Sequence, residues 1–270
     1  ARGIHGGARR WRCEPEPFAR LAAQPTVWFE SERVNLLACI RQACHAGLTE
    51  LAWDLAASTA FFFSMVGYQD WREVHRLADA AARGAGDARG QAALLVALGW
   101  VGFDRTPPTK GSQVFARARE SFERLGDLPG TAEALLGEGN SLRLAGRPRQ
   151  ALACLRRARA LAVQTGAPDQ EAAARFGLAM VDRDQGRPDR TLAGLRRILP
   201  VWRQRGARRW EVLTVRMTAL ALGDQGDLAA AEAQLRGALA LADELDDAQE
   251  RLLILVYLGE LHYRQGELET

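Results

Sequence analysis

The sequence has few of the residues that mark disulfide-stabilised, metal-binding or membrane-spanning proteins. Its 270 residues include only four cysteines, three methionines and one lysine, Lys110. The cysteines have no metal-ligand or disulfide-framework spacing, so we expect Cys13, Cys39, Cys44 and Cys154 to be reduced, in a cytoplasmic protein. No apolar run approaches the roughly 20 residues of a spanning helix. The basic start, ARGIHGGARRWR, is not followed by the apolar segment of a signal peptide.

Catalytic patterns are missing as well. The four histidines form no H-E-x-x-H motif, and no serine lies in a G-x-S-x-G motif. No G-x-x-x-x-G-K-[ST] loop occurs, so the chain should not bind ATP. Acidic pairs such as Asp182 and Asp184 fall at expected helix ends, where Asp suits caps and turns. The sequence therefore predicts a protein that is not an enzyme and that binds no cofactor or metal.

The charge of the chain is nearly balanced. A net charge of +3 is too small to indicate nucleic-acid binding. The arginine clusters at 156–159, 196–197 and 203–209 favour solvated outer faces, because the alternative, a nucleic-acid stripe, lacks interleaved aromatic residues. At the N-terminus, Arg9, Arg10 and Arg12 favour a solvated tail, with contact to a phosphate backbone as the alternative.

Two series of turn residues recur at steps of 40 residues. One series consists of Gly146, Gly186, Gly226 and Gly266. The other lies between its members and consists of Gly86, Gly126, Gly166, Gly206 and Asp246. Two interleaved series that stay in phase over 180 residues indicate an array of helical hairpins, as in a solenoid.

The apolar periodicity predicts helices between these turns and no strands. We expect helices at 28–45, 49–66, 70–84, 88–103 and 112–125, hairpins at 129–165, 168–205 and 208–245, and a last helix at 247–265. Helix content should exceed roughly 70%, against about a third in average proteins. Residues 1–27 are predicted to be a linker or the tail of a preceding domain, 28–85 divergent helices with a first repeat, and 86–270 the repeats, the last one truncated. We expect the chain to be part of a longer protein, because it begins with Ala and stops at a turn.

Small residues recur where the two helices of a hairpin would cross. In the first helices these are Gly139, Ala179, Ala219 and Gly259, and in the second helices Ala151, Thr191 and Ala231. Four residues beyond the second set lie Leu155, Leu195 and Leu235, which are expected to fill the space between repeats. Two helix axes can approach closely only where side chains are small, so we expect the small residues to be buried.

This pattern resembles the tetratricopeptide repeat (TPR), whose small residue before the turn and two alanines after it match Gly139, Ala151 and Ala158. The family's usual repeat has about 34 residues, and the longer period here implies helices about one turn longer in total. This longer form resembles the sensor regions of signal-transducing ATPases of the STAND class. The resemblance implies an all-α fold, a TPR-like helical-hairpin solenoid that forms a right-handed superhelix with 40-residue repeats.

The segment before the repeats adds a second resemblance. Residues 28–37, WFESERVNLL, resemble the W-[FY]-x-x-E-R-x-N-L segment that opens the repeat region of SARP-type regulators of antibiotic biosynthesis in actinomycetes. Gly67-Tyr68, followed by Trp71 and His75, resembles the first repeat of that family. There, the repeats follow a DNA-binding domain, an activation domain and an ATPase domain. None of these is present in this sequence, so DNA binding would belong to those other domains.

In TPR folds the first helix of each hairpin lines a concave groove. By this resemblance the groove would contain Val96, Trp100, Phe103, Leu136, Asn140, Arg143, Phe176, Met180, Arg183, Arg216, Leu220, Gly223, Val256, Glu260 and Tyr263. For Trp100 and Phe103, a place in the core is an equal alternative. For Asn140 and the three arginines burial is not expected, and the alternative is a solvated groove without a ligand.

From their repeat positions we expect Arg143, Arg183 and Arg216 to face one concave patch with few acids between them. The patch would bind an anionic or carboxylate-bearing partner, because an arginine fork matches a carboxylate or phosphate. Arg143 and Arg183 would lie about 8–10 Å apart, as on adjacent packed helices. The other residues of the predicted ligand-binding set are Trp100, Phe103, Asn140, Phe176 and Met180.

The sequence leaves two functions open. The first is a non-enzymatic sensor and interaction domain of a bacterial SARP-type regulator of secondary metabolism, which binds a small anionic effector or a protein segment in its groove. The second is a generic TPR scaffold for protein–protein interaction without a regulatory ligand. The expected partners are that ligand, the ATPase and DNA-binding domains of a full-length protein, and a second copy of the chain. Direct contact with nucleic acid or a membrane is not expected.

Overall fold

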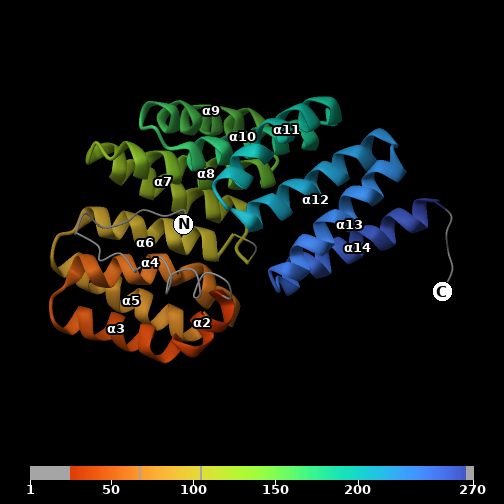
Figure 1. The fold of residues 1–270 in the computed structure, drawn as a ribbon. Coiled ribbons are helices and arrows are strands. Elements are labelled where there is room, and N and C mark those ends of the chain that lie inside the picture. Colours follow the sequence, from red (N-terminus) through yellow and green to blue (C-terminus); the bar gives the residue numbers. More distant parts are fainter. Residues whose placement is uncertain (1–24, 67, 104, 266–270) are drawn as a thin grey trace. The chain divides into compact units, whose positions relative to one another are not determined.

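The structure is built from α-helices. The computed structural model describes residues 25–66, 68–103 and 105–265 (Figure 1). Thirteen helices contain 87% of these residues, and no strand occurs among them. The all-α prediction is therefore confirmed. Residues 1–24 of the predicted tail lie outside the described residues, as do Gly67 and the turn at Gly266.

The first compact unit of the chain extends to Thr165. From α3 onward each of its helices packs against the next one in sequence, and α6 packs against both α4 and α8. The first helices of successive hairpins therefore lie side by side. The helices of this unit are α2 (Pro25–Ser31), α3 (Arg33–His45), α4 (Thr49–Val66), α5 (Tyr68–Gly84), α6 (Ala88–Val101), α7 (Pro108–Arg124), α8 (Leu128–Leu144) and α9 (Pro148–Gln164).

The second compact unit begins at Gly166. Each of its helices again packs against the next, and α14 also packs against α12. The right-handed course of the whole array stays a prediction. The helices of this unit are α10 (Pro168–Asp184), α11 (Pro188–Gln204), α12 (Arg208–Gln225), α13 (Leu228–Glu244) and α14 (Ala248–Gln265).

Both predicted series of turns are confirmed in the described residues. Every glycine of the two series from Gly86 to Gly226 has a positive φ, between 62° and 87°. At Gly126 the chain closes the helix end, because the Asp127 amide donates to the Phe122 carbonyl at 3.0 Å. Asp246 has φ 50° and is the only described non-glycine residue in this conformation, which L side chains rarely adopt.

The next helix starts directly after each turn. At Asp87 and Asp127 the side chain accepts a hydrogen bond of 2.8 Å from the amide three residues later, which satisfies a free donor of the first turn. After Gly146 and Gly186, Pro148 and Pro188 are the first helical residues, where a missing amide proton costs nothing. Turn chemistry therefore fixes where one helix ends and the next begins.

The small residues lie where the sequence predicts them. Ala151 is 0% and Ala231 1% exposed, and Thr191 between them in the sequence is also buried. A side chain built on Gly139 would come within 2.8 Å of Leu155, so α8 and α9 approach too closely there for a larger residue. The prediction is wrong for Gly259, which is not at a helix crossing: nothing lies within 4 Å of an added Cβ. The described residues contain no helix after α14 that could pair with it as the second helix of a hairpin.

A phenylalanine fills the centre of the first unit. Phe115 of α7 is fully buried. Its ring would lie 2.5 Å from a Cβ on Gly99 of α6 and 2.2 Å from one on Gly137 of α8. The two glycines therefore form the slot that admits the ring between neighbouring first helices, and both belong to the core rather than to flexible segments.

The N-terminal helix differs from its prediction at 28–45. It consists of α2 and α3, with the break at Glu32. The Ser31 hydroxyl donates to the Trp28 carbonyl at 2.8 Å, and the Asn35 amide donates to the Glu32 carboxylate at 2.8 Å. Such local side-chain bonds compete with the regular helix and bend it.

Candidate functional site

The predicted groove positions are divided between the two compact units. Those on α6 and α8 belong to the first unit, and those on α10, α12 and α14 belong to the second. The groove residues of each unit are therefore described separately, from the contacts within that unit. The expected distance between Arg143 and Arg183 joins the two units and stays a prediction.

Trp100 and Phe103 form an aromatic pair at the end of α6. Both are half-buried, and their ring centroids are 5.4 Å apart. The Trp100 ring meets Phe115 edge-on at 5.2 Å, and its Nε1 donates to Glu133 Oε1 of α8 at 3.2 Å. Glu133 is itself buried. Trp100 therefore anchors α6 to α7 and α8 while part of its surface remains accessible.

Asn140 and Arg143 lie on α8 of the same unit. Both are half-buried. Asn140 Nδ2 donates to the Leu136 carbonyl one turn earlier, at 2.9 Å, which leaves its amide oxygen available as an acceptor. Arg143 lies in the last turn of the helix, where a positive charge is favoured by the helix dipole.

In the second unit, Phe176 and Met180 of α10 are buried. The Phe176 ring meets the Trp210 ring of α12 edge-on, with centroids 5.5 Å apart. These two side chains therefore stabilise the packing of the unit and do not form an open apolar wall. This corrects the role that the sequence predicted for them.

Arg216 is a clearer correction. It is 5% exposed, and its Nε donates to Oε2 of the equally buried Glu250 at 2.8 Å. The guanidinium also lies 5.8 Å from the centroid of the Tyr257 ring, so α14 supplies both of its partners. A charge can be buried only when it is paired in this way. Arg216 is thus committed to the junction of α12 and α14 and does not face a solvated groove.

Arg183 lies at the surface of the second unit and has an acidic neighbour. Its Nε lies 2.9 Å from Asp224 Oδ2 of α12, and both side chains are partly exposed. The expectation of few acids among the arginines is therefore wrong, because Asp224 and Glu250 each pair with one of them. Repeat spacing places the arginines on their helices but does not reveal partners 41 and 34 residues away.

Arg183 also borders a pocket of about 130 Å³ in the second unit. Three other predicted groove residues line it, Leu220, Gly223 and Glu260. Sequence reasoning missed Asp224, Tyr257 and Arg264, which complete the polar lining. Arg264 follows Glu260 by four residues, and that spacing is the one available signal that both reach the same helix face.

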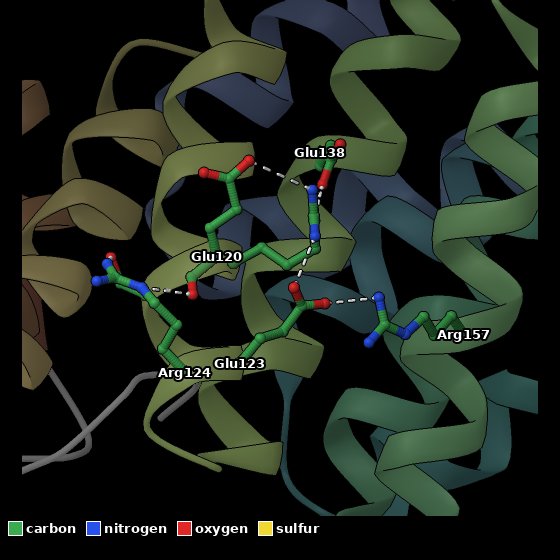
Figure 2. A network of polar contacts seen from close by, with 7 residues as sticks. Glu120, Glu123, Arg124, Glu138 and Arg157 are labelled. Atoms are coloured by element: carbon green, nitrogen blue, oxygen red, sulfur yellow. Dashed lines mark hydrogen bonds and ion pairs between the residues drawn. The ribbon is translucent and has the colours of Figure 1, made fainter.

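A network of charged residues joins three helices of the first unit (Figure 2). Arg119 of α7 lies 2.8 Å from Glu138 of α8 and 2.8 Å from Glu123 of its own helix. Arg157 of α9 lies 2.6 Å from the same Glu123 carboxylate. In Figure 2 a dashed line joins Glu123 of α7 to Arg157 of α9. The network links α7, α8 and α9 to one another.

Among the described residues, Cys154 and His75 are the cysteine and histidine whose pKa values burial shifts away from the charged form most clearly. Burial, helped by the Glu138 charge, raises the pKa of the Cys154 thiol to about 11, so the reactive thiolate is scarce at neutral pH. Burial lowers the pKa of His75, whose Nε2 lies 2.9 Å from the Leu94 carbonyl. Both groups are therefore neutral at pH 7 and serve the packing of their helices.

No cluster of three or more potential metal ligands occurs in the described part of the chain. None of its helices is both long enough and apolar enough to cross a membrane.

No family model matches the sequence, and no curated protein matches it. Solved structures do match the fold. A STAND protein with a tetratricopeptide repeat sensor, from Pyrococcus horikoshii, aligns with a TM-score of 0.58 and 11% identity over 92% of this chain. The chain spans only 41% of the length of that protein.

Two smaller proteins align along most of their own length. BtubC (BKLC) from P. vanneervenii has a TM-score of 0.61 and 12% identity, over 80% of this chain and 92% of its own. The apo form of RapI has a TM-score of 0.56 and 13% identity, over 78% of this chain and 92% of its own. At these identities the likeness establishes the fold, which is TPR-like, as the sequence predicted.

Proposed function

We propose that this chain is the sensor and interaction domain of a bacterial transcriptional regulator of the SARP type, which controls secondary metabolism such as antibiotic biosynthesis. One observation carries the interaction role: Trp100 of α6, Phe103 directly after it, and Asn140 and Arg143 of the neighbouring α8 are all half-buried in one unit. Rigid aromatic anchors beside an arginine are typical of the residues that contribute most to protein binding. The regulator role is supported by the WFESERVNLL segment and by the STAND protein of the same fold.

The bound partner is proposed to be a protein segment that carries a carboxylate. Arg143 would receive the carboxylate, Asn140 would accept a backbone amide proton, and the Trp100 face would pack on an apolar side chain. Arg183, on α10 of the second unit, is the other surface arginine that the sequence predicts to bind a ligand. If the groove is solvated and binds no ligand, replacing these side chains should not change the binding of any partner. Binding measurements on variants therefore distinguish a binding groove from a solvated one.

The test uses the full-length protein as bait for partners in its own cells, followed by binding measurements with the purified partner. The double variant Arg143→Ala/Arg183→Ala should lose most of the affinity while keeping the helical circular dichroism signal. The matched control is Arg149→Ala/Arg190→Ala, which removes one exposed arginine of a second helix in each unit. Equal affinity of the two double variants would sink the groove assignment.

The alternative is a generic TPR scaffold without a regulatory ligand, which the fold alone also supports. The sequence of the full-length gene distinguishes the regulator from the generic scaffold. An ATPase loop and a DNA-binding domain upstream of this chain would support the regulator. A gene without them would leave the scaffold as the function.

A further inference from the structure

The pocket of the second unit combines an apolar floor with a charged rim. Its floor is formed by Ala219 of α12, Ala231 and Leu235 of α13, and Leu261 of α14. Its volume is about 130 Å³, which leaves room for an aliphatic group of a few carbon atoms. Ligand sites combine apolar lining residues with convergent polar groups, and this pocket is small and contains both kinds.

The pocket exists because of a glycine. Gly223 stands 40 residues after Arg183 and 80 after Arg143, at the position where those first helices carry a long side chain. A Cβ on Gly223 would have ordinary contacts, 3.6 Å to Arg264 and 3.9 Å to Ala231. Packing therefore does not demand glycine here, and a glycine inside a helix is destabilising relative to alanine. What the glycine provides is open space and a backbone carbonyl that the Arg264 side chain can reach.

The rim carries groups of both signs with unused hydrogen-bonding capacity. Arg264 Nη2 donates to the Gly223 carbonyl at 3.0 Å, and Arg183 Nε lies 2.9 Å from Asp224. Each arginine has five N–H donors, so both retain several. Glu260 is exposed at the rim, one turn before Arg264. At that spacing the two side chains would normally pair, but Arg264 turns to Gly223 instead.

We propose that this pocket is a binding site for a small aliphatic zwitterion of the α-amino acid type. The arginine forks of Arg183 and Arg264 receive its carboxylate, because a planar guanidinium matches a carboxylate with two hydrogen bonds. The Glu260 carboxylate accepts hydrogen bonds from its ammonium group. The aliphatic side chain of the ligand lies on the alanine and leucine floor.

A zwitterion fits this rim better than a simple ion does. The rim has two guanidinium groups and two carboxylates, so it is close to neutral and attracts neither an anion nor a cation strongly by its net charge. An anion would leave Glu260 opposed to its own charge, and a cation would be repelled by Arg183 and Arg264. A ligand with both charges at a fixed separation uses both sides of the rim at once.

The inference deepens the proposed function, because an amino acid bound in the second unit would be the effector of the sensor. Only the role of the amino acid as a regulatory effector rests on the proposed function, and its binding to the pocket does not. Binding of the zwitterion is measured on this chain alone, whereas the groove is tested with a protein partner and with Arg143. Each of the two proposals can therefore fail while the other stands.

The test is isothermal titration of the chain with L-alanine, L-valine and L-leucine, with thermal shift as a second readout. At least one of the three should bind and raise the melting temperature. L-leucinamide, which lacks the carboxylate, and 4-methylpentanoate, which lacks the ammonium group, should bind about tenfold more weakly or worse, since each loses a charged hydrogen-bonding group. Absence of binding by all three amino acids overturns the proposal, and so does binding of both truncated analogues as tightly as L-leucine.

Two variants locate the binding site. Gly223→Arg fills the pocket with the side chain that the preceding first helices carry, and binding should be lost. Gly237→Arg is the matched control, because Gly237 is exposed on α13 with nothing within 4 Å of an added Cβ, and its binding should be unchanged. Glu260→Gln changes an exposed position and should weaken binding of the amino acid about tenfold, whereas 4-methylpentanoate, no longer opposed by that negative charge, should bind at least as tightly as before. Full amino acid affinity in Glu260→Gln, or in a folded Gly223→Arg, places the ligand elsewhere and overturns the assignment.

Discussion

Ala151 is fully buried on α9, one turn before the leucine that packs on Gly139 of α8. Replacement by leucine adds three carbon atoms to a space already filled by neighbouring helices. We expect Ala151→Leu to lower the free energy of unfolding by about 1–3 kcal/mol, the usual cost of overpacking a core. Urea denaturation followed by circular dichroism measures the change.

Ala153 provides the matched control, because it is exposed on the same helix and has the same starting residue. Ala153→Leu should change the free energy of unfolding by less than about 0.5 kcal/mol, as surface substitutions usually do. A similar loss in both variants would show that leucine disturbs α9 itself. An unchanged stability of Ala151→Leu would contradict the register of the hairpin.

For individual residues, the sequence predicts the structural role where the repeat itself determines that role. Burial of Ala151 and Ala231 and the positive φ of the turn glycines follow from recurrence at fixed steps. The burial of Arg216 does not follow, because it depends on Glu250 and Tyr257 arriving from a helix that is distant in the sequence. Repeat spacing says which helix carries a residue, and its contacts decide what that residue does.

Among the helices of the second unit, α12 and α14 are joined by the buried pair of Arg216 and Glu250. Removing one partner leaves the other charge buried without compensation. We expect Glu250→Ala to cost about 3–5 kcal/mol of unfolding free energy, as for other broken buried pairs. Replacing both residues together, as Arg216→Met/Glu250→Leu, should recover most of that loss, because apolar residues of similar volume often replace a buried pair without cost.

Glu244 serves as the control in the same unit, since it pairs with Arg208 at an exposed position. Glu244→Ala should cost less than about 1 kcal/mol, the usual range for a surface ion pair. Thermal and urea unfolding of the four proteins measure these differences. A double variant no more stable than Glu250→Ala would show that the charges are needed for more than mutual compensation.

Helix positions are predictable where the chain carries its own start and stop signals. The regular hairpins from α8 to α13 have their turns at the predicted glycines, and Pro or Asp stands at each following helix start except that of α12, which begins at Arg208 after Ala207. Helix boundaries are predicted less well where two possible start signals adjoin or where no such signal exists. The helix α7 starts at Pro108, earlier than expected, because the second of two prolines occupies its first turn. The break at Glu32 comes from local side-chain bonds that carry no periodic signal.

For the whole molecule, the period of the repeat determines the fold but not the ligand. Stacking of hairpins requires small residues and turn glycines at fixed positions, and these leave the TPR-like pattern visible in one sequence. Groove and pocket residues are free to differ from repeat to repeat, as the sequence Arg143, Arg183, Gly223 shows at equivalent positions. The recognition chemistry therefore has to be derived from side-chain contacts, which is why Arg264 and Asp224 were not anticipated.

One face of α14 has no partner in the described part of the chain, and we expect it to drive self-association. Leu252, Leu255 and Val256 are 64%, 43% and 58% exposed, whereas the equivalent Val212, Val215 and Arg216 of α12 are buried. Contact of this apolar stripe with water costs roughly 25 cal/mol per Å² of surface. Pairing of two copies through α14 would remove that surface, and the open space at Gly259 would let the two helices approach closely.

Sedimentation velocity over a range of concentrations tests this pairing. The chain should shift from monomer to dimer as concentration rises, and Leu252→Glu/Leu255→Glu should remain monomeric at every concentration. The matched control, Leu125→Glu/Val163→Glu, changes two exposed apolar residues of the first unit and should dimerise like the parent chain. A parent chain that stays monomeric at high concentration would contradict the prediction. Equal loss of dimer in both double variants would indicate nonspecific hydrophobic association, because only the first pair of substitutions adds charge to the uncovered face of α14.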